Sequence, residues 1–269
     1  MQLLAGSAEA RSVRALGPDQ FRESEFGVFS QWGEDGIIQF LLAHVPIADR
    51  AFVEFGVEDY REANTRFLLQ HDYWAGLILD RGQDHVEYVE RSGLAWRHTI
   101  EARSSFLDCD NINQVIADGG MRGDIGLLSV DVDGNDYWLL DAIDVVAPRI
   151  LVAEYNSLFG PTASVTVPYD PGFDRRTAHG SGLYYGASLT ALTKAAERKG
   201  MSLVGCNRAG VNAFFVRSDL VGDIPTRTPH EAFVERQHRE ARAADGALLY
   251  TSGAEAQRAL IAGAPLVTI

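Results

Sequence analysis

Cysteine is scarce in this sequence, with only Cys109 and Cys206 among its 269 residues. Two cysteines leave room for one bridge but cannot form a disulfide framework, and these two lack the Cys-x-x-Cys spacing of thiolate zinc sites. This usage fits a reducing compartment, so we expect a cytoplasmic protein.

Positive charge is also scarce. The chain has 24 lysines and arginines against 37 aspartates and glutamates, which gives a formal net charge of −13. Nucleic-acid binding takes most of its affinity from basic side chains that neutralise phosphates, and anionic membrane surfaces attract basic segments in the same way. The composition therefore argues against nucleic acid and membrane surfaces as partners.

Long apolar runs are absent. No run reaches the roughly 18 residues that a membrane-spanning helix needs, and the N-terminus lacks the basic stretch followed by an apolar one that marks a secretory signal. We expect neither a membrane span nor secretion. Hydrophobic residues still make up 46% of the chain, which is enough to build the core of a globular domain.

What the sequence does contain is a βαβ rhythm. Short apolar runs alternate with helix-length segments, and a helix is expected to begin near Glu34. Such alternation predicts an α/β fold with a mostly parallel sheet covered by helices on both faces. Two further runs flank Asn207 to Gly210 and predict an antiparallel hairpin at the end of a seven-stranded sheet. The expected strands are 51–55, 76–79, 96–100, 125–130, 150–153, 202–204 and 213–216.

The same patterning divides the chain. Residues 1–29 are weakly patterned and form an N-terminal extension, and 30–220 form the main domain. Glycines and prolines interrupt the apolar rhythm after Asn156, so 158–186 is expected to be a lid-like insertion, followed by a helix from about 187 to 199. The tail, 221–269, contains one charged helix at about 230–244 and is expected to pack on the domain or on a partner.

Acids stand where ligands bind in an open parallel sheet, beyond the carboxyl ends of the strands. The first predicted strand ends in Glu54 and Gly56, where a glycine lets the backbone approach a ligand and an acid can reach a cationic amine. The second ends in Asp80, at about the spacing from Glu54 at which nucleotide-binding folds hold ribose hydroxyls. The turn after Gly56 carries Glu58 and Asp59 instead of further glycines, and these acids would repel a pyrophosphate. The sequence thus favours a cofactor without phosphates.

Acidic residues also follow the fourth and fifth predicted strands. Asp131 and Asp133 alternate onto one side and Glu154 comes from the neighbouring strand, so three oxygen ligands are expected to converge. Such a set suits a hard divalent cation, and the same carboxylates could instead supply a general base. The alternative is that these acids only cap a helix, as Asp133 or Asn135 would before residues 137–143.

The long loop holds further polar candidates. His179 lies beside Arg175 and Arg176, where it would act as a base or metal ligand if the loop closes over substrate, or would stay solvated if it does not. Asn156 opens the loop and Tyr184 ends it, so both are candidates for contact with a substrate. The alternative for Tyr184 is packing into the core.

Four motifs occur in order along the chain: Ser-Gln-x-Gly-Glu-Asp-Gly from Ser30, Val-Glu-Phe-Gly-Val from Val53, Asp-Val-Asp-Gly-Asn-Asp-Tyr-Trp from Asp131 and Glu-Tyr-Asn-Ser from Glu154. With them the chain resembles the FkbM-like branch of the S-adenosylmethionine-dependent methyltransferases, and most closely a subgroup that carries all four. The resemblance covers about residues 30 to 216. It implies a Rossmann-like class I methyltransferase fold and S-adenosylmethionine as cofactor, although Val-Glu-Phe-Gly-Val departs from the usual Glu/Asp-x-Gly-x-Gly-x-Gly loop.

The resemblance also implies places for individual residues around the cofactor. Glu54 and Gly56 would contact its methionine moiety, and Asp80 would bind its ribose hydroxyls. The other residues expected at the cofactor are Ser30 and Gln31 on the methionine side, Ser105, Phe106 and Asn111 flanking the adenine, and Arg81 and Asp131.

Methyl transfer would further need a base and an aligned acceptor. Asp131, Asp133 and His179 are the available bases, and Mg²⁺ or another divalent cation on Asp131, Asp133 and Glu154 would lower the pKa of an acceptor hydroxyl. The implied reaction is O-methylation of a sugar or a specialised small metabolite. Asn156, His179 and Tyr184 would lie near this small-molecule acceptor, and a homo-oligomer is compatible with the interpretation.

Three alternatives stay open. The first is an N-methyltransferase that acts on an amino-acid-like small molecule and uses the same cofactor site. The others are a non-catalytic binding protein and a metal-dependent hydrolase, each built on the same fold, and neither of them needs S-adenosylmethionine.

Overall fold

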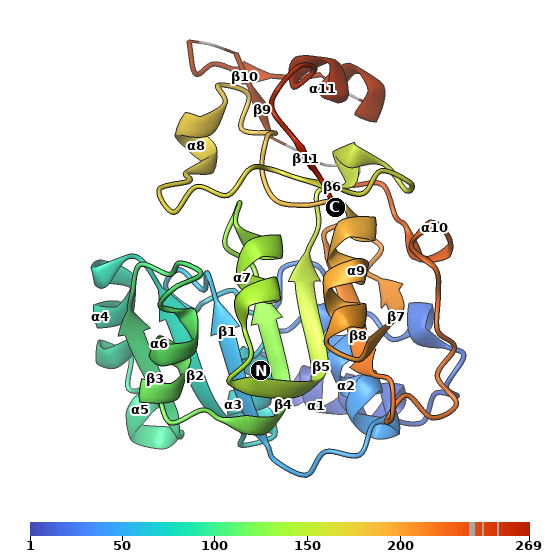
Figure 1. Cartoon of the computed structure of the whole chain (residues 1–269). Coiled ribbons are helices and arrows are strands. Elements are labelled where there is room, and N and C mark those ends of the chain that lie inside the picture. Colours follow the sequence, from blue (N-terminus) through green and yellow to red (C-terminus); the bar gives the residue numbers. More distant parts are fainter. Residues whose placement is uncertain (237–239, 244, 252) are drawn as a thin grey trace.

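The computed structural model describes residues 1–236, 240–243, 245–251 and 253–269. A large sheet forms the centre, and smaller elements lie above the carboxyl ends of its strands (Figure 1). Within the described residues, no helix has the length and apolar character needed to cross a membrane.

The central sheet has seven strands in the order β3-β2-β1-β4-β5-β8-β7. All its pairings are parallel except those of β8, which runs antiparallel to both β5 and β7. This confirms the expected fold, a Rossmann-like mostly parallel sheet that ends in an antiparallel hairpin. The strands are β1 (Ala51–Phe55), β2 (Ala75–Asp80), β3 (Ile100–Ser104), β4 (Gly123–Val130), β5 (Val146–Glu154), β7 (Met201–Cys206) and β8 (Asn212–Arg217).

Helices cover both faces of the sheet because successive strand residues point to opposite sides. Phe52 packs into the core on one side and Val53 into the core on the other. The Phe52 side is covered by α1 (Gln2–Val13), α2 (Glu34–His44), α3 (Arg66–His71) and α4 (Gln83–Arg91). The Val53 side is covered by α6 (Ile112–Asp118), α7 (Asp136–Ala142) and α9 (Leu189–Arg198), which cross the front of Figure 1. The helix start at Glu34 is confirmed.

One predicted strand is misplaced. The segment 96–100 was expected to be extended, but Trp96 lies in the short helix α5 (Leu94–Arg97) and its side chain is exposed. Glycine at position 93 adopts the left-handed conformation and starts this turn. The strand begins only at Ile100, which pairs with Gly76 of β2, so strand pairing and not local β propensity sets its start.

The insertion after Asn156 is folded over the carboxyl ends of the strands (Figure 1). It contains a 3₁₀ turn, η2 (Ser157–Phe159), a short strand, β6 (Val165–Thr166), and a helical turn, α8 (Arg175–Ala178). Strand β6 pairs antiparallel with β11 (Val267–Thr268) at the end of the chain. We call residues 158–186 the lid; its inner strand is therefore held by the tail.

The helix predicted at about 230–244 is wrong. Only α10 (Pro229–Ala232) is helical there, and residues 233–236 and 240–243 are not. The backbone of Val234 exchanges hydrogen bonds with the Tyr155 hydroxyl, and the Arg236 N–H donates to Ser157 Oγ, so this segment lies extended against β5 and η2. The tail continues with β9 (Ala241–Arg242), β10 (Leu248–Leu249) and α11 (Ala254–Leu260), while residues 237–239 and 244 lie outside the described residues.

Candidate functional site

The acids that follow the strands lie in one row along the carboxyl edge of the sheet. Glu54 pairs with Ile78 on β2 and with Ser129 on β4, and Glu154 pairs with Asn212 on β8. Side chains at paired positions of neighbouring strands point to the same face, here the face that α1, α2 and α3 cover. The row on this face is Asp80, Glu54, Asp131, Glu154 and Asn212.

Glu54 stands at the predicted place, but the chain already surrounds its carboxylate. The carboxylate accepts from the Asn64 N–H at 2.8 Å, the Thr65 N–H at 3.1 Å and the Thr65 hydroxyl at 2.5 Å. Burial raises the pKa of Glu54 to about 7, against the lowering effect of these bonds. Glu54 thus fastens the start of α3 to β1 and organises the turn at which the cofactor is expected.

Gly56 brings the turns after β1 and β4 into contact. Its φ is +69°, and a Cβ built on it would lie 1.7 Å from the Asp131 carbonyl oxygen. Only glycine fits this position. The glycine does permit a close backbone approach, as expected, and the neighbour that it approaches is Asp131.

Asp80 shapes the turns around the second strand end. Its carboxylate accepts from the Glu58 N–H at 2.8 Å and the Gly82 N–H at 2.7 Å, and it contacts the His85 ring at 3.0 Å. The hydrogen bond to Asp80 raises the pKa of His85. A carboxylate offers about four acceptor positions, so these three contacts leave roughly one for a ligand hydroxyl.

The other residues expected near the cofactor flank Asp80. The Ser105 N–H donates to the Asp80 carbonyl at 2.9 Å, and the Phe106 side chain is half exposed. Arg81 points to the lid, where it forms an ion pair with Asp174 at 3.0 Å. Arg81 therefore ties the second strand end to the lid.

Ser30 and Gln31 precede α2. The Ser30 hydroxyl accepts from the Asp35 N–H at 2.9 Å, and the Asp35 carboxylate in turn accepts from the backbone N–H groups of Val28, Phe29 and Ser30. Burial raises the pKa of Asp35 to about 6. Gln31 is exposed. The structure thus gives Ser30 a part in starting the helix, which faces the same side of the sheet as the row of acids.

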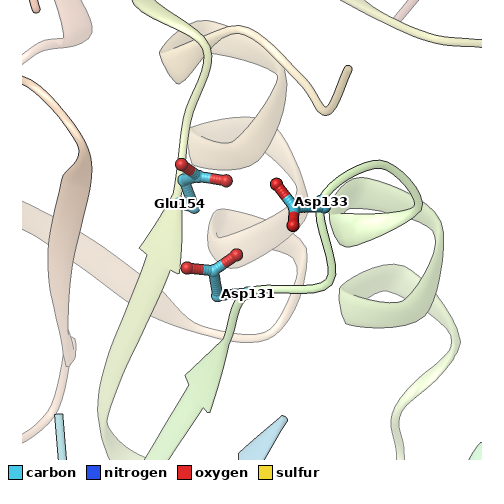
Figure 2. A group of neighbouring side chains, drawn as sticks. All are labelled: Asp131, Asp133 and Glu154. Carbon is cyan, nitrogen blue, oxygen red and sulfur yellow. The ribbon is translucent and has the colours of Figure 1, made fainter. Parts of the chain in front are cut away.

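Asp131, Asp133 and Glu154 form one cluster, which we call the acidic triad (Figure 2). One carboxylate oxygen from each residue lies within 4.8 Å of the others. Asp131 and Asp133 come from the turn after β4, and Glu154 is the last residue of β5. Glu154 Oε2 is buried and finds no hydrogen-bond partner among the residues that the structure describes.

The triad is electrostatically unfavourable without a cation. Burial, together with the charges of Glu154 and Asp133, raises the pKa of Asp131 well above its ordinary value. Burial and the charges of Asp133 and Asp136 raise the pKa of Glu154 to about 8. Carboxylates this close favour either a shared proton or a positive ion between them.

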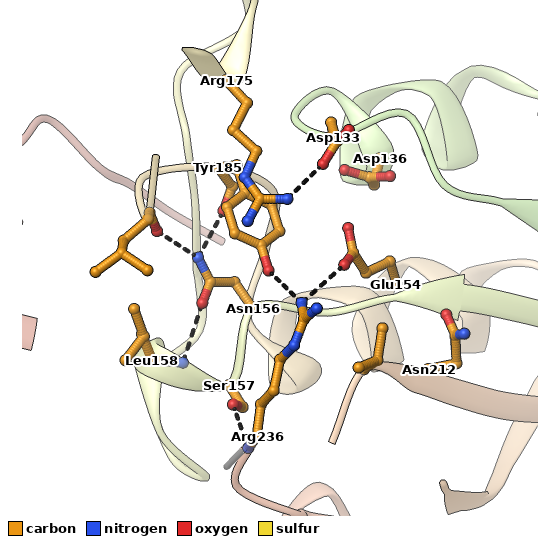
Figure 3. A network of polar contacts seen from close by, with 12 residues as sticks. Asp133, Asp136, Glu154, Asn156, Ser157, Leu158, Arg175, Tyr185, Asn212 and Arg236 are labelled. Carbon is orange, nitrogen blue, oxygen red and sulfur yellow. Dashed lines mark hydrogen bonds and ion pairs between the residues drawn. The ribbon is translucent and has the colours of Figure 1, made fainter. Parts of the chain in front are cut away.

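Two arginines hold the outer oxygens of the triad (Figure 3). Arg175 Nη1 of the lid lies 2.7 Å from Asp133 Oδ1, and its guanidinium lies over the Tyr185 ring at 3.8 Å. Arg236 Nη1 of the tail lies 3.5 Å from Glu154 Oε1 and 3.2 Å from the Tyr185 hydroxyl. The inner oxygens stay directed at one another. Sequence reasoning missed Arg236, because nothing in its local pattern places the tail beside β5.

The segment after Asp131 is the seat of the lid. The Phe173 ring packs on Gly134, where a Cβ would come within 2.1 Å of it. The Asn135 amide donates to the Asp170 carbonyl, and the Trp138 indole N–H donates to the Val167 carbonyl, each at 2.9 Å. The motif from Asp131 to Trp138 therefore fixes the lid as well as the triad.

The capping alternative for this segment is wrong. The N-cap of α7 is Asn135, and its side chain makes no capping hydrogen bond. Asp136 satisfies the turn instead, accepting from the N–H groups of Val132 at 2.8 Å and Gly134 at 3.0 Å. Asp131 and Asp133 are thus left for the triad.

The three loop candidates do not join the triad. The His179 ring contacts Ser181 Oγ at 2.8 Å, and the cluster of acids found in the described part of the chain does not include it. Asn156 uses both amide hydrogens on the carbonyls of Leu183 and Tyr185, each at 3.0 Å. The buried Tyr184 donates its hydroxyl to the carbonyl of Pro265. These contacts shape the lid. 

No family model matches the sequence. No curated protein matches it either. Three solved structures are similar in fold at low identity. An S-adenosylmethionine-dependent methyltransferase from Clostridium acetobutylicum ATCC 824 is 10% identical with a TM-score of 0.43, over 68% of this chain and 89% of that one. An O-methyltransferase from Bacillus cereus in complex with SAH is 11% identical with a TM-score of 0.43, over 80% and 88%. The N-terminal domain of EvdMO1 with SAH bound is 12% identical with a TM-score of 0.42, over 78% and 94%. The fold assignment made above rests on the strand order and pairings of this chain.

Proposed function

We propose that this protein is an S-adenosylmethionine-dependent methyltransferase. In this proposal it methylates a hydroxyl of a sugar or specialised small metabolite in the cytoplasm, assisted by a divalent cation on Asp131, Asp133 and Glu154. The observation that carries the proposal is the position of the acidic triad, which adjoins the Gly56 turn through the Asp131 carbonyl. The resemblance places the methionine end of the cofactor at that turn, so methyl donor and cation would be neighbours.

The residues fit a hard cation. Each triad residue supplies a carboxylate oxygen, Glu154 Oε2 is buried without a partner, and oxygen ligands are those that Mg²⁺ prefers. A bound cation would polarise the acceptor hydroxyl and lower its pKa. Arg175 and Arg236 keep one oxygen each of Asp133 and Glu154, and so leave the inner oxygens free.

The chain's own groups supply the rest of the chemistry. The acceptor oxygen attacks the methyl carbon in line while the carbon–sulfur bond breaks and its electron pair returns to sulfur. The hydroxyl proton passes to a carboxylate, for which Asp131 is suited because its pKa is raised. The lid packs on Gly134 and Asn135 and would exclude water while it aligns the acceptor.

Calorimetric titration with S-adenosylmethionine and S-adenosylhomocysteine tests the cofactor. We expect micromolar binding that Asp80→Ala weakens at least about tenfold, because the turns around the ribose position lose their anchor. Asp84→Ala, which changes an exposed acid of the same turn, is the matched control and should bind normally. Absence of binding by the wild-type protein would refute the proposal.

A second titration, with Mn²⁺, tests the cation. Asp131→Ala should lose Mn²⁺ binding and methyl transfer but keep most of its affinity for S-adenosylhomocysteine. Asp144→Ala, at an exposed acid nearby in sequence, should change neither. Methyl transfer that survives in Asp131→Ala would show that the catalytic assignment is wrong.

The triad alone also suits a metal-dependent hydrolase. That function predicts Mn²⁺ binding with no affinity for S-adenosylhomocysteine, whereas a binding protein without catalysis predicts no product with any acceptor. An N-methyltransferase would release S-adenosylhomocysteine with amine acceptors and not with hydroxyl acceptors.

A further inference from the structure

Asn212 stands beside Glu154 at the end of the row. The two residues are directly paired in the antiparallel β5–β8 ladder, so their side chains lie next to each other on the same face. Asn212 is only 4% exposed. Its Oδ1, like Glu154 Oε2, finds no hydrogen-bond partner among the residues that the structure describes. Two buried acceptors without a donor therefore face one small region.

The amide of Asn212 is held in a defined orientation. Its Nδ2 donates to Glu34 Oε1 at 2.9 Å, and only the NH₂ end of an amide can donate to a carboxylate. Oδ1 must therefore point away from Glu34. Glu34 is itself fixed, because it is fully buried and accepts from Asn207 Nδ2 at 2.7 Å and from the Trp32 N–H at 2.8 Å.

Asn207 shows what a purely structural asparagine looks like in the same place. It donates to the same oxygen of Glu34, and its own Oδ1 accepts from the N–H groups of Val211 and Asn212. Every part of the Asn207 amide is thus explained by the hairpin turn. The oxygen of Asn212 has no such explanation.

We propose that Asn212 Oδ1 is a fourth oxygen ligand of the cation at the acidic triad, and that Glu34 is the residue that positions it. This inference rests on the cation in the proposed function. An amide carbonyl is an ordinary ligand of Mg²⁺ and Ca²⁺ and completes a site without adding charge. That matters here, because three carboxylates already exceed the charge of a divalent ion. The Ser30 motif then acts on the site through Glu34.

The test compares Mn²⁺ affinity in Asn212→Leu and Asn212→Asp. Leucine has a similar size and no oxygen, so we expect affinity to fall about 10- to 100-fold. Aspartate keeps the oxygen, so we expect affinity within about threefold of wild type or tighter. A purely structural asparagine would give the reverse order, because aspartate places a second carboxylate against Glu34 and leucine does not.

Three results would overturn the inference. Wild-type affinity in Asn212→Leu would show that the oxygen is not a ligand, and equal losses in both variants would show that only the fold was affected. Absence of Mn²⁺ binding by the wild-type protein would remove this inference together with the cation, while the titration with S-adenosylhomocysteine would still decide the cofactor.

A measurement on the unmutated protein guards against misfolded variants. In ¹⁵N-labelled wild type, Mg²⁺ should shift the side-chain amide resonances of Asn212 more than those of Asn207. Equal or absent shifts at saturating Mg²⁺ would contradict direct ligation. Glu34→Gln should weaken Mn²⁺ binding about tenfold, as expected for a group that orients a ligand.

Discussion

The carboxylates that follow β1 and β2 are filled by the chain's own donors, whereas those that follow β4 and β5 face one another. Glu54 and Asp80 each accept two backbone N–H groups. Asp131 and Glu154 instead raise each other's cost of ionisation, and Glu154 Oε2 has no described partner. Identical chemical groups on one sheet edge are therefore satisfied on one side and left open on the other. A buried polar group without a partner is expensive, so the open half is the one that points to a ligand.

The strongest way to break this comparison is to separate the two halves where they touch. Gly56→Ala places a Cβ against the Asp131 carbonyl and forces alanine into a left-handed conformation. We expect a loss of about 4 kcal/mol of unfolding free energy, measured by urea titration. Gly120→Ala is the matched control, since Gly120 has φ +75° and open space around it, and should cost about 1 kcal/mol. Equal costs would mean that the contact between the turns does not matter.

The next test addresses the filled half through pH. The pKa of Glu54 is raised to about 7, so the folded state binds a proton more tightly than the unfolded state. Its contribution to stability is therefore full below about pH 4.5 and is lost as pH rises through about 7, by about 3 kcal/mol in all. Glu54→Gln removes this loss and should be less destabilising at pH 8 than at pH 5. Urea unfolding of both proteins at several pH values measures the difference, and parallel curves would contradict the assignment.

The open half should respond in the opposite sense to removal of an acid. Asp131→Asn takes away a carboxyl whose ionisation is opposed by burial and by Glu154 and Asp133. We expect the cation-free protein to gain about 1–2 kcal/mol at pH 8, where an aspartate would be ionised in the unfolded chain. Thermal unfolding without and with Mn²⁺ measures both sides, because the ion should stabilise only the wild type. Asp144→Asn serves as the control at an exposed acid, and a destabilised Asp131→Asn would contradict the account.

The sequence was sufficient for the sheet and for the meeting of the triad, since both follow from local pattern. Parallel strands put their carboxyl ends at one edge, so Asp131, Asp133 and Glu154 had to come together. Trp96 shows the limit: an apolar stretch looked like a strand, but pairing with β2 starts only at Ile100. The charged segment after His230 resembled a surface helix, yet hydrogen bonds to Tyr155 and Ser157 hold part of it extended.

What the sequence could not supply is long-range partnership. Arg236 reaches Glu154 from the tail, and Glu34 reaches Asn212 from the start of the chain. Neither contact has a periodicity or a spacing that would reveal it. Asn156 and Tyr184 were rightly noticed as loop residues, but only the three-dimensional contacts show that their polar groups hold the lid together.

The smallest expected effect concerns the two ties between lid and sheet, which come from adjacent lid residues. Asp174 pairs with Arg81 on the filled half, where the arginine side chain is 62% exposed, and Arg175 pairs with Asp133 on the open half, where it is 25% exposed. Exposed ion pairs contribute little, so Arg81→Gln should cost at most about 0.5 kcal/mol of local lid stability. Arg175→Gln also loses the Tyr185 ring and the Gly182 carbonyl and should cost about 1–2 kcal/mol.

Hydrogen exchange of lid amides between residues 165 and 182 measures this difference directly. Arg176→Gln, an exposed neighbour in the same helical turn, should leave exchange unchanged. If Arg81→Gln loosened the lid as much as Arg175→Gln, the lid would depend equally on both halves of the edge. The distinction between a filled and an open half would then describe the carboxylates alone and not the element that covers them.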